Sequence, residues 1–410
     1  MSPAASTPRQ LRQVLGAAGV GAGLTLRPGP PGTLTDAEAR AAATDWGMLD
    51  ADATGIVVVL VDGLGMEQLQ ERRGHAPTLR AWLSQAPYGA AACTCLPSTT
   101  AAALTTLGTG ALPGVTGMVG YCVLNPRLGR DLPAGTVPSA DQNLCLITWD
   151  GNAPNPRAWQ DVPTIFERLA DPEVPQRAPL AVTIGPQRFA GSGLTEAALR
   201  GAPHVGADRL EDRPALAAAA LRRGVPLIYL YVGELDHAGH QHGWRSPQWL
   251  EQFERLDQAL AELARRVPAG TRILLTADHG MIDTDPAHRL NLVDWPELNR
   301  DVVAIAGEPR FSQLYVPGSD PDLAAAVADR WRTVLGERAL WVGTRADAPT
   351  RFGPLSERAT SVLGDVLVAM ADNWVVVDPR VHTEGAMAMP GVHGSATEAE
   401  MTVPLLLAGD

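Results

Sequence analysis

The chain has 410 residues, of which 45% are hydrophobic and 19% charged, and a formal net charge of -12 at pH 7. Arginine supplies every positive charge, because the sequence contains no lysine. This length is enough for a large hydrophobic core and for two structural units. The acidic balance and the lack of basic runs argue against stable nucleic-acid binding, but not against a small phosphorylated substrate held by metal ions.

The N-terminal segment combines two arginines with a partly apolar run. Arg9 and Arg12 precede VLGAAGVGAGLTL (residues 14–26). This order resembles a signal peptide only weakly, because glycines interrupt the run and no convincing cleavage site follows it. No stretch of the sequence is long and apolar enough to span a membrane. We therefore expect a cytoplasmic protein without a membrane partner, and the sequence leaves its oligomeric state open.

Four cysteines lie in the first half of the chain, at Cys93, Cys95, Cys122 and Cys145. The Cys-x-Cys pair at 93–95 has the spacing of a metal site, but no second pair and no neighbouring histidine supports one. We interpret this pair as buried apolar cysteine. The pattern does not indicate a disulfide framework.

Apolar runs that are typical of buried parallel strands alternate with helical segments. A helix is expected over residues 35–43, after a Pro/Gly-rich loop at 28–33. Continuous runs of valine, leucine and isoleucine then predict strands within 55–65, 225–240 and 271–281. Residues 246–266 have helical apolar spacing, with proline directly after the serine N-cap. This alternation predicts an α/β fold whose central sheet is mainly parallel and sandwiched by helices.

Residues 301–385 have a different pattern. Short strands are expected near 311–316 and 373–377, and DPDLAAAVADRWRTVLG (residues 320–336) predicts a helix. We interpret 301–385 as a small inserted α+β subdomain that caps the site. The core would then comprise residues 1–300 and 386–410.

Each of the three predicted strands ends at an aspartate, namely Asp62, Asp236 and Asp278. Ligands of open α/β sheets bind beyond the carboxyl ends of the strands, so these three carboxylates should converge on one edge. His240 lies four residues after Asp236, which places both on one helix face.

Two histidines add to this set. His279 directly follows Asp278, and His393 lies between glycines in GVHG (residues 391–394). Carboxylates and imidazoles gathered after successive strands predict two divalent metal ions. The mixed oxygen and nitrogen ligands favour Zn²⁺, with Mn²⁺ as an alternative.

Several of these segments together resemble the alkaline phosphatase superfamily. They are VVLVDGLG, LPSTTAAALTTLGTG, YVGELDHAGHQHG, LLTADHGM, and GVHG followed by EMTVPLLLAG, in this order. The nucleotide pyrophosphatase/phosphodiesterase-like branch is the most similar, together with phosphonoacetate hydrolase. The resemblance implies an alkaline phosphatase-like core. It covers most of residues 55–295 and the C-terminal tail, and it is weak for the N-terminus and the insertion.

The segment CLPSTTAAALTTLGTG (residues 95–110) offers three hydroxyls, at Ser98, Thr99 and Thr100. From the residues alone, these hydroxyls fit either a nucleophile or a helix N-cap. The resemblance selects one of them by register. In the superfamily, Thr-Gly follows the nucleophile by nine positions at the end of its helix, and nine positions before Thr109 lies Thr100. The sulfatase motif Cys-x-Pro-Ser-Arg is excluded, because its cysteine would lie five positions too early and Thr99 replaces its arginine.

The resemblance further implies two ligand sets. One consists of Asp62, Thr100, Asp278 and His279, and the other of Asp236, His240 and His393. Tyr121 lies in the register of an asparagine that contacts a phosphoryl oxygen in related diesterases. A tyrosine hydroxyl can donate the same hydrogen bond, and its ring could equally pack against the leaving group of the substrate or against the core.

The expected function is a two-metal hydrolase that cleaves phosphodiester or nucleotide pyrophosphate bonds of a small phosphorylated substrate, such as a nucleotide, through a phospho-threonine intermediate. A phosphomonoesterase or phosphonate hydrolase is the alternative, and would need an arginine beside the phosphate, for which Arg127 and Arg130 are candidates. A non-catalytic metal-binding protein is the third interpretation, but it predicts the loss of a ligand or of the nucleophile, and all seven positions are filled.

Overall fold

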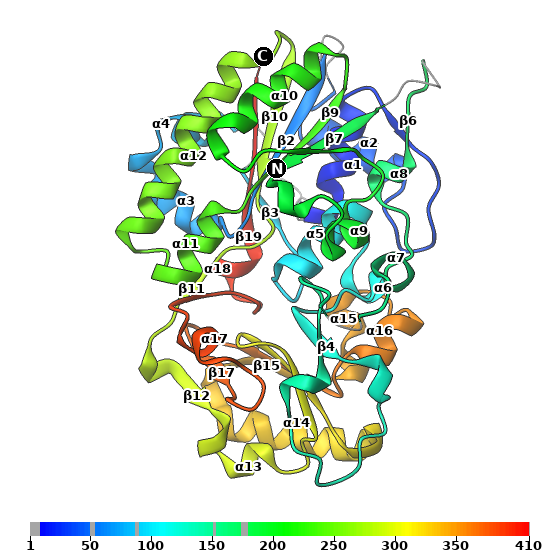
Figure 1. Ribbon diagram of the computed structural model, residues 1–410, viewed down its shortest axis with the longest axis vertical. Coiled ribbons are helices and arrows are strands. Elements are labelled where there is room, and N and C mark those ends of the chain that lie inside the picture. The colour runs from blue at the N-terminus through cyan, green and yellow to red at the C-terminus, as the bar shows by residue number, and fades with distance from the viewer. Residues whose placement is uncertain (1–8, 50–53, 87–89, 151–152, 174–178, 410) are drawn as a thin grey trace, which may run out of the picture.

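The larger of two structural units is built on a seven-stranded sheet (Figure 1). The structure is a computed structural model that describes residues 9–49, 54–86, 90–150, 153–173 and 179–409. In spatial order the strands are β3 (Ala91–Cys93), β19 (Thr402–Ala408), β10 (Thr271–Thr276), β2 (Gly55–Val61), β9 (Leu227–Val232), β7 (Ala181–Gly185) and β8 (His204–Gly206).

The five strands from β10 to β8 run parallel to one another, whereas β19 pairs antiparallel with β10 and β3 antiparallel with β19. Every residue of the central strand β2 is buried, as expected for a strand covered on both faces. The prediction of an α/β fold with a mainly parallel central sheet is therefore confirmed. The antiparallel strands β19 and β3 complete one edge and make the sheet mixed.

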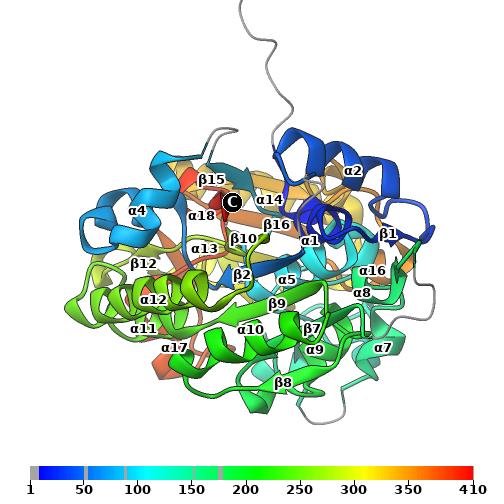
Figure 2. The same ribbon diagram turned by 90° about the horizontal axis from the view of Figure 1, so that it is seen from above.

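Helices cover both faces of this sheet (Figure 2). One group comprises α1 (Leu11–Gly21), α2 (Asp36–Asp45), α5 (Thr100–Thr109) and α9 (Gly193–Ala198). The other comprises α3 (Met66–Arg72), α4 (Pro77–Ser84), α10 (Arg213–Arg222), α11 (Glu234–His242) and α12 (Pro247–Arg266). The predicted helices at 35–43 and 246–266 are confirmed by α2 and α12, and Ser246 caps α12 by accepting a hydrogen bond from the backbone N–H of Trp249. Within the described residues, none of the helices has the length and apolarity needed to cross a bilayer.

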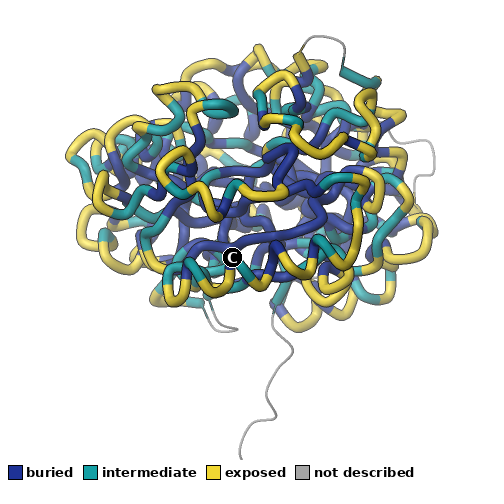
Figure 3. Tube along the Cα trace, turned by 90° about the horizontal axis from the view of Figure 1, so that it is seen from below, coloured by how far each residue is buried: buried dark blue, intermediate teal, exposed yellow. Residues whose placement is uncertain are grey.

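The smaller unit contains a four-stranded antiparallel sheet covered by one long helix. Its strands, in spatial order, are β13 (Ala304–Glu308), β14 (Phe311–Tyr315), β16 (Val366–Met370) and β15 (Ala339–Thr344), and its helix is α14 (Pro321–Leu335). A separate hydrophobic cluster, which extends from Leu290 to Val376, fills this unit. Buried segments occupy the interior of the molecule and exposed segments its rim (Figure 3).

Shorter elements connect and flank the two units. The strands pair as β1 (Thr25–Leu26) with β6 (Leu169–Ala170), β4 (Cys122–Leu124) with β5 (Asn143–Cys145), β11 (Ile282–Asp283) with β18 (Gly391–Val392), and β12 (Arg289–Asn291) with β17 (Val375–Val377). The helices are α6 (Pro113–Thr116), α7 (Pro156–Trp159), α8 (Ile165–Arg168), α13 (Pro296–Asn299), α15 (Pro349–Phe352), α16 (Glu357–Val362), α17 (Glu384–Ala388) and α18 (Glu398–Met401).

Two contacts fix the smaller unit to other parts of the chain, namely the segment that leads into β19 and the hairpin of β4 and β5. Arg310 and Glu400 form an ion pair at 2.6 Å, and both side chains are fully buried. The hairpin of β4 and β5 packs against β13 through a small cluster that includes Leu124 and Ala304. The smaller unit therefore lies beyond the carboxyl ends of the parallel strands, next to the predicted site.

Candidate active site and metal centres

A cleft of about 530 Å³ lies at the carboxyl ends of β2 and β9, beside the first turn of α5. Its walls include Asp62, Thr100, Tyr121, Asp236 and His393. Five residues predicted from separate parts of the sequence thus face one cavity.

The first cluster joins Asp62, after β2, with Asp278 and His279, after β10. His279 Nε2 lies 3.4 Å from a carboxylate oxygen of each aspartate, and the three side chains are almost completely buried. Thr100 Oγ1 lies 3.2 Å from the same nitrogen. The four residues that the resemblance assigned to one metal ion are therefore in contact with one another.

In each carboxylate of this cluster, one oxygen accepts hydrogen bonds and the other has no hydrogen-bond partner in the described ranges of the chain. Asp278 Oδ1 accepts hydrogen bonds from the backbone N–H groups of Gly63 and His279, and Tyr231 donates its hydroxyl to Asp62 Oδ2 at 2.5 Å. Among the described residues, Asp62 Oδ1 and Asp278 Oδ2 have no hydrogen-bond partner.

Charge repulsion adds to this imbalance. Burial, followed by the charges of Asp278 and Asp236, raises the pKa of Asp62 well above its ordinary value. Buried carboxylates that repel one another need a compensating cation. The donor set therefore fits a divalent ion.

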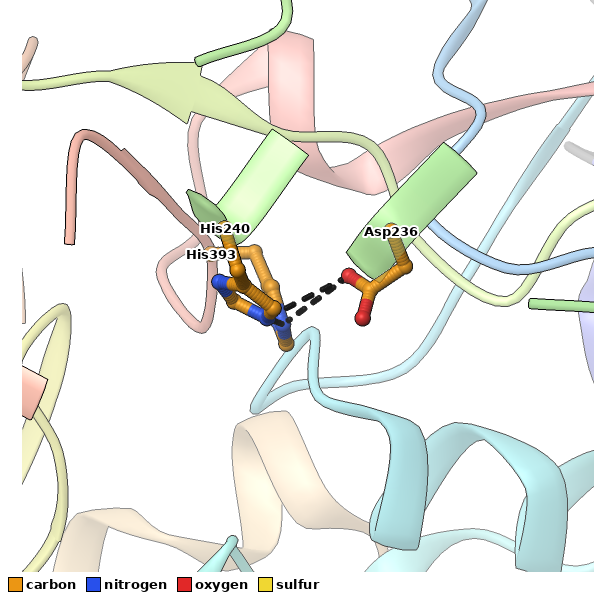
Figure 4. A group of neighbouring side chains, drawn as sticks. All are labelled: Asp236, His240 and His393. Atoms are coloured by element: carbon orange, nitrogen blue, oxygen red, sulfur yellow. Dashed lines mark hydrogen bonds and ion pairs between the residues drawn. The ribbon is translucent and has the colours of Figure 1, made fainter. Parts of the chain in front are cut away.

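The second cluster joins Asp236 and His240, one turn apart on α11, with His393, which follows β18 (Figure 4). His240 Nε2 lies 3.3 Å from Asp236 Oδ1, and the Nε2 atoms of His240 and His393 lie 3.3 Å apart. The predicted helical turn after β9 places both α11 ligands on one face, as their spacing indicated.

The ring tautomers of this cluster follow from the backbone. His240 Nδ1 lies 2.8 Å from the carbonyl oxygen of Gly391, and His393 Nδ1 lies 2.9 Å from that of Ser98. A carbonyl oxygen only accepts, so both Nδ1 atoms donate and both Nε2 lone pairs face Asp236. Two imidazole nitrogens and one carboxylate are a typical zinc ligand set. The Nδ1 atom of each imidazole is held by a backbone carbonyl, which orients the ring.

The two clusters are adjacent. The rings of His279 and His393 stack with centroids 3.6 Å apart. Burial, together with the charges of His279 and His240, lowers the pKa of His393 well below its ordinary value, so this ring is neutral near pH 7 and could bind a metal ion.

Glycines allow the His393 segment to approach α11. A side chain at Gly391 would place its Cβ 2.2 Å from the carbonyl oxygen of Gly239, and Gly394 has a φ of +134°.

The three candidate hydroxyls have different environments. Thr99 occupies the N-cap position of α5, but its side chain makes no capping hydrogen bond, and Ser98 donates its hydroxyl to the carbonyl oxygen of Ser395 at 2.6 Å. Thr100 begins the helix and faces His279. The capping interpretation is therefore wrong for this segment, because the N-cap side chain makes no capping hydrogen bond and the hydroxyls of Ser98 and Thr100 make other contacts.

Tyr121 lies on the cleft wall, with 42% of its surface exposed. Its backbone N–H donates to the buried carboxylate of Glu308 at 2.8 Å. Glu308 ends β13, so the smaller unit holds this side of the cleft. Burial raises the pKa of Glu308 to about 8. No sequence pattern indicates this role, because Glu308 lies far from Tyr121 along the chain.

The arginines proposed for phosphate binding lie elsewhere. Arg130 pairs with Asp365 at 2.7 Å in the smaller unit, and Arg127 lies within the turn of residues 126–128 that follows β4. Arg188 instead lines the cleft and stacks on the ring of Phe189. This residue was missed because β7, the strand that precedes it, is a short apolar run. The rule that ligands bind beyond the carboxyl ends of the strands places Arg188 at this edge only once β7 is recognised as a strand of the sheet.

The cysteines match the sequence interpretation in part. All four are free, and Cys95 is buried, whereas Cys93, Cys122 and Cys145 are partly exposed.

The central sheet, the two ligand clusters and the hydroxyl at the start of α5 define a protein of the alkaline phosphatase superfamily. The model of the family described as type I phosphodiesterase/nucleotide pyrophosphatase matches residues 56–396. The chain belongs to this family. A search of curated protein sequences gives no significant match.

Solved structures show the same fold. Phosphonoacetate hydrolase from Sinorhizobium meliloti 1021, in complex with phosphonoformate, matches with a TM-score of 0.62 and 19% identity, over 86% of this chain and 89% of that chain. Murine ectonucleotide pyrophosphatase/phosphodiesterase 5 matches with a TM-score of 0.63 and 16% identity, over 87% and 88%. An inactive variant of the murine protein was solved in complex with AMP, and it matches with a TM-score of 0.62 and 16% identity over the same shares.

Proposed function

We propose that this protein is a two-metal hydrolase that cleaves phosphodiester or nucleotide pyrophosphate bonds through a phospho-threonine intermediate on Thr100. The observation that carries the proposal is the position of the Thr100 hydroxyl. It lies at the first turn of α5, 3.2 Å from His279 and within the cleft that both ligand clusters face.

Asp62, Asp278 and His279 would hold one ion with Thr100, and Asp236, His240 and His393 would hold the other. Bound divalent ions, with Zn²⁺ favoured, lower the pKa of a coordinated hydroxyl or water and offset the charge of phosphoryl oxygens.

The remaining roles belong to the chain. Thr100 Oγ1 forms a bond to phosphorus as the bond to the leaving oxygen breaks, and water then cleaves the phospho-threonine ester. The free N–H groups at the start of α5 favour a phosphoryl oxygen at this position. Tyr121 contacts the substrate from the opposite wall.

A phosphomonoesterase or phosphonate hydrolase on the same scaffold is the second candidate. Arg188 favours it, since a guanidinium on the cleft wall can pair with the additional negative charge of such a substrate. The family assignment to diesterases favours the first candidate.

The test compares bis(4-nitrophenyl) phosphate with 4-nitrophenyl phosphate, both hydrolysed by the zinc-loaded protein. We expect a higher kcat/KM for the diester. Thr100→Ala should lose activity with both substrates, which excludes a contaminant, and Thr100→Ser should retain part of it. A higher kcat/KM for the monoester would favour the phosphomonoesterase or phosphonate hydrolase instead. Full activity of Thr100→Ala would refute the role of Thr100.

A further inference from the structure

A second cavity opens beside Thr100 and extends away from the metal clusters. Its volume is about 360 Å³. It shares with the cleft the side chains of Thr100, Ile147, Arg188, Phe189 and Tyr231. We call it the apolar cavity. Because it joins the cleft at the proposed nucleophile, a group attached to the reacting phosphorus can enter it.

The deep part of the apolar cavity lies between α5, α9 and the strands β7 and β9. Leu104 lies one turn beyond Thr100 on α5, and Ile184 comes from β7. Leu194 and Leu199 close the cavity from α9 and the residue that follows it. All four side chains are buried. The walls therefore offer hydrocarbon surface to an occupant.

The polar side chains within these walls are paired with one another. His204 Nε2 lies 3.2 Å from the carbonyl oxygen of Pro186, so it donates, and Nδ1 accepts from the hydroxyl of Thr183 at 3.0 Å. Ser192 donates to Thr195 at 3.0 Å. These groups have little capacity left for a polar occupant. A nucleobase carries several donors and acceptors that would lose water here without replacement, which is costly.

Tyr229 is the exception. Its side chain is 2% exposed and lines the apolar cavity, and its hydroxyl has no hydrogen-bond partner among the described residues. A buried hydroxyl of this kind needs a partner from the occupant. The occupant should therefore be largely hydrocarbon and carry a single acceptor oxygen.

We propose that the apolar cavity binds an aliphatic chain of the phosphoryl substrate, with the Tyr229 hydroxyl donating to an ester or ether oxygen of that chain. This inference rests on the proposed function and specifies its substrate class. Arg188, at the junction of cleft and cavity, would lie beside the phosphoryl group of such a substrate.

The first test is a series of alkyl 4-nitrophenyl phosphodiesters from methyl to octyl, which share one leaving group. Each methylene buried in the cavity should raise kcat/KM about fourfold, so that butyl exceeds methyl about 60-fold, until the cavity is filled. A kcat/KM that does not change with chain length, or that favours methyl, would overturn the proposal.

Thr148→Trp tests the location. Thr148 is an exposed residue of the cavity wall, so a larger side chain fills the cavity without disturbing the core. This variant should lose at least tenfold in the ratio of octyl to methyl kcat/KM. Thr333→Trp makes the same exchange at an exposed position of α14 and should keep the wild-type ratio. An unchanged ratio in Thr148→Trp would place the chain outside this cavity.

Binding separates this proposal from the proposed function. Calorimetric titration of the zinc-loaded protein with octylphosphonate and methylphosphonate, which it need not hydrolyse, should show much tighter binding of the octyl compound. Diester hydrolysis with equal affinities for the two phosphonates would refute binding of an aliphatic chain in the apolar cavity and leave the proposed function intact. Octyl-selective binding without hydrolysis would refute the proposed function alone. Tyr229→Phe should weaken the binding of a phosphonate whose alkyl chain contains an ether oxygen and leave the binding of octylphosphonate unchanged. Equal effects on both affinities would refute the role of this hydroxyl.

Discussion

Glu308→Gln should reduce the loss of folding stability as pH rises from 5 to 8.5. Glu308 is 6% exposed, and burial raises its pKa from an ordinary value of 4.5 to about 8. A carboxyl whose pKa is higher in the folded state stabilises the fold below its unfolded pKa, and this stabilisation is lost as pH rises to the folded pKa. Between pH 5 and pH 8.5 this loss should reach about 4 kcal/mol. Glutamine keeps the acceptor for the backbone N–H of Tyr121 and has no such proton to lose.

The measurement is urea unfolding of wild type and variant at several pH values between 5 and 8.5, with a chelator present so that metal binding does not contribute. Subtracting one curve from the other removes every other titrating group. Between pH 5 and pH 8.5, the free energy of unfolding of the variant should rise by about 4 kcal/mol relative to that of wild type. Glu337→Gln, an exposed exchange in the same unit, should follow wild type. If wild type and Glu308→Gln lose stability in parallel, the Glu308 carboxyl is already ionised in the folded protein, and its pKa is not raised by burial.

Three further predictions concern the metals and the join between the units. Tyr231→Phe removes the donor to Asp62 and should lower zinc affinity about tenfold, as measured by competition with a chromogenic chelator. Removing bound zinc, supplied at 1,000 times its Kd, should cost about 4 kcal/mol of stability, visible as a lower unfolding temperature that returns with zinc. Glu400→Gln leaves the buried Arg310 without its counter-charge and should destabilise the protein by about 3 kcal/mol or more in urea, whereas replacing both residues with methionine should recover much of this loss.

The position of the candidate site could be predicted from the sequence because its candidate ligands follow strong local patterns. Asp62 and Asp278 end long apolar runs, and the spacing of Asp236 and His240 requires only one helical turn. Thr100 needed the register of a family resemblance, because neighbouring hydroxyls fit the same local pattern. Its contact with His279 now distinguishes it from them.

The parts that select a substrate could not be predicted in this way. Arg188 follows a short strand, and Glu308 acts through contacts between residues far apart along the chain. The apolar cavity has no sequence signature, since leucines and isoleucines that line a cavity have the same spacing as those that fill a core. Tyr229 illustrates this, because its sequence position is that of a core residue of β9, and only the structure shows that its hydroxyl has no hydrogen-bond partner within the described part of the chain.

The distribution of these residues suggests how reaction and substrate choice are divided within the molecule. The ligand clusters rest on the central sheet and on β18, while Tyr121 is held by a carboxylate of the smaller unit. The apolar cavity lies on the other side of Thr100, within the larger unit. If the apolar cavity binds the substrate as proposed, substitutions around Leu104 should alter which substituents fit while the two candidate ligand clusters keep their positions.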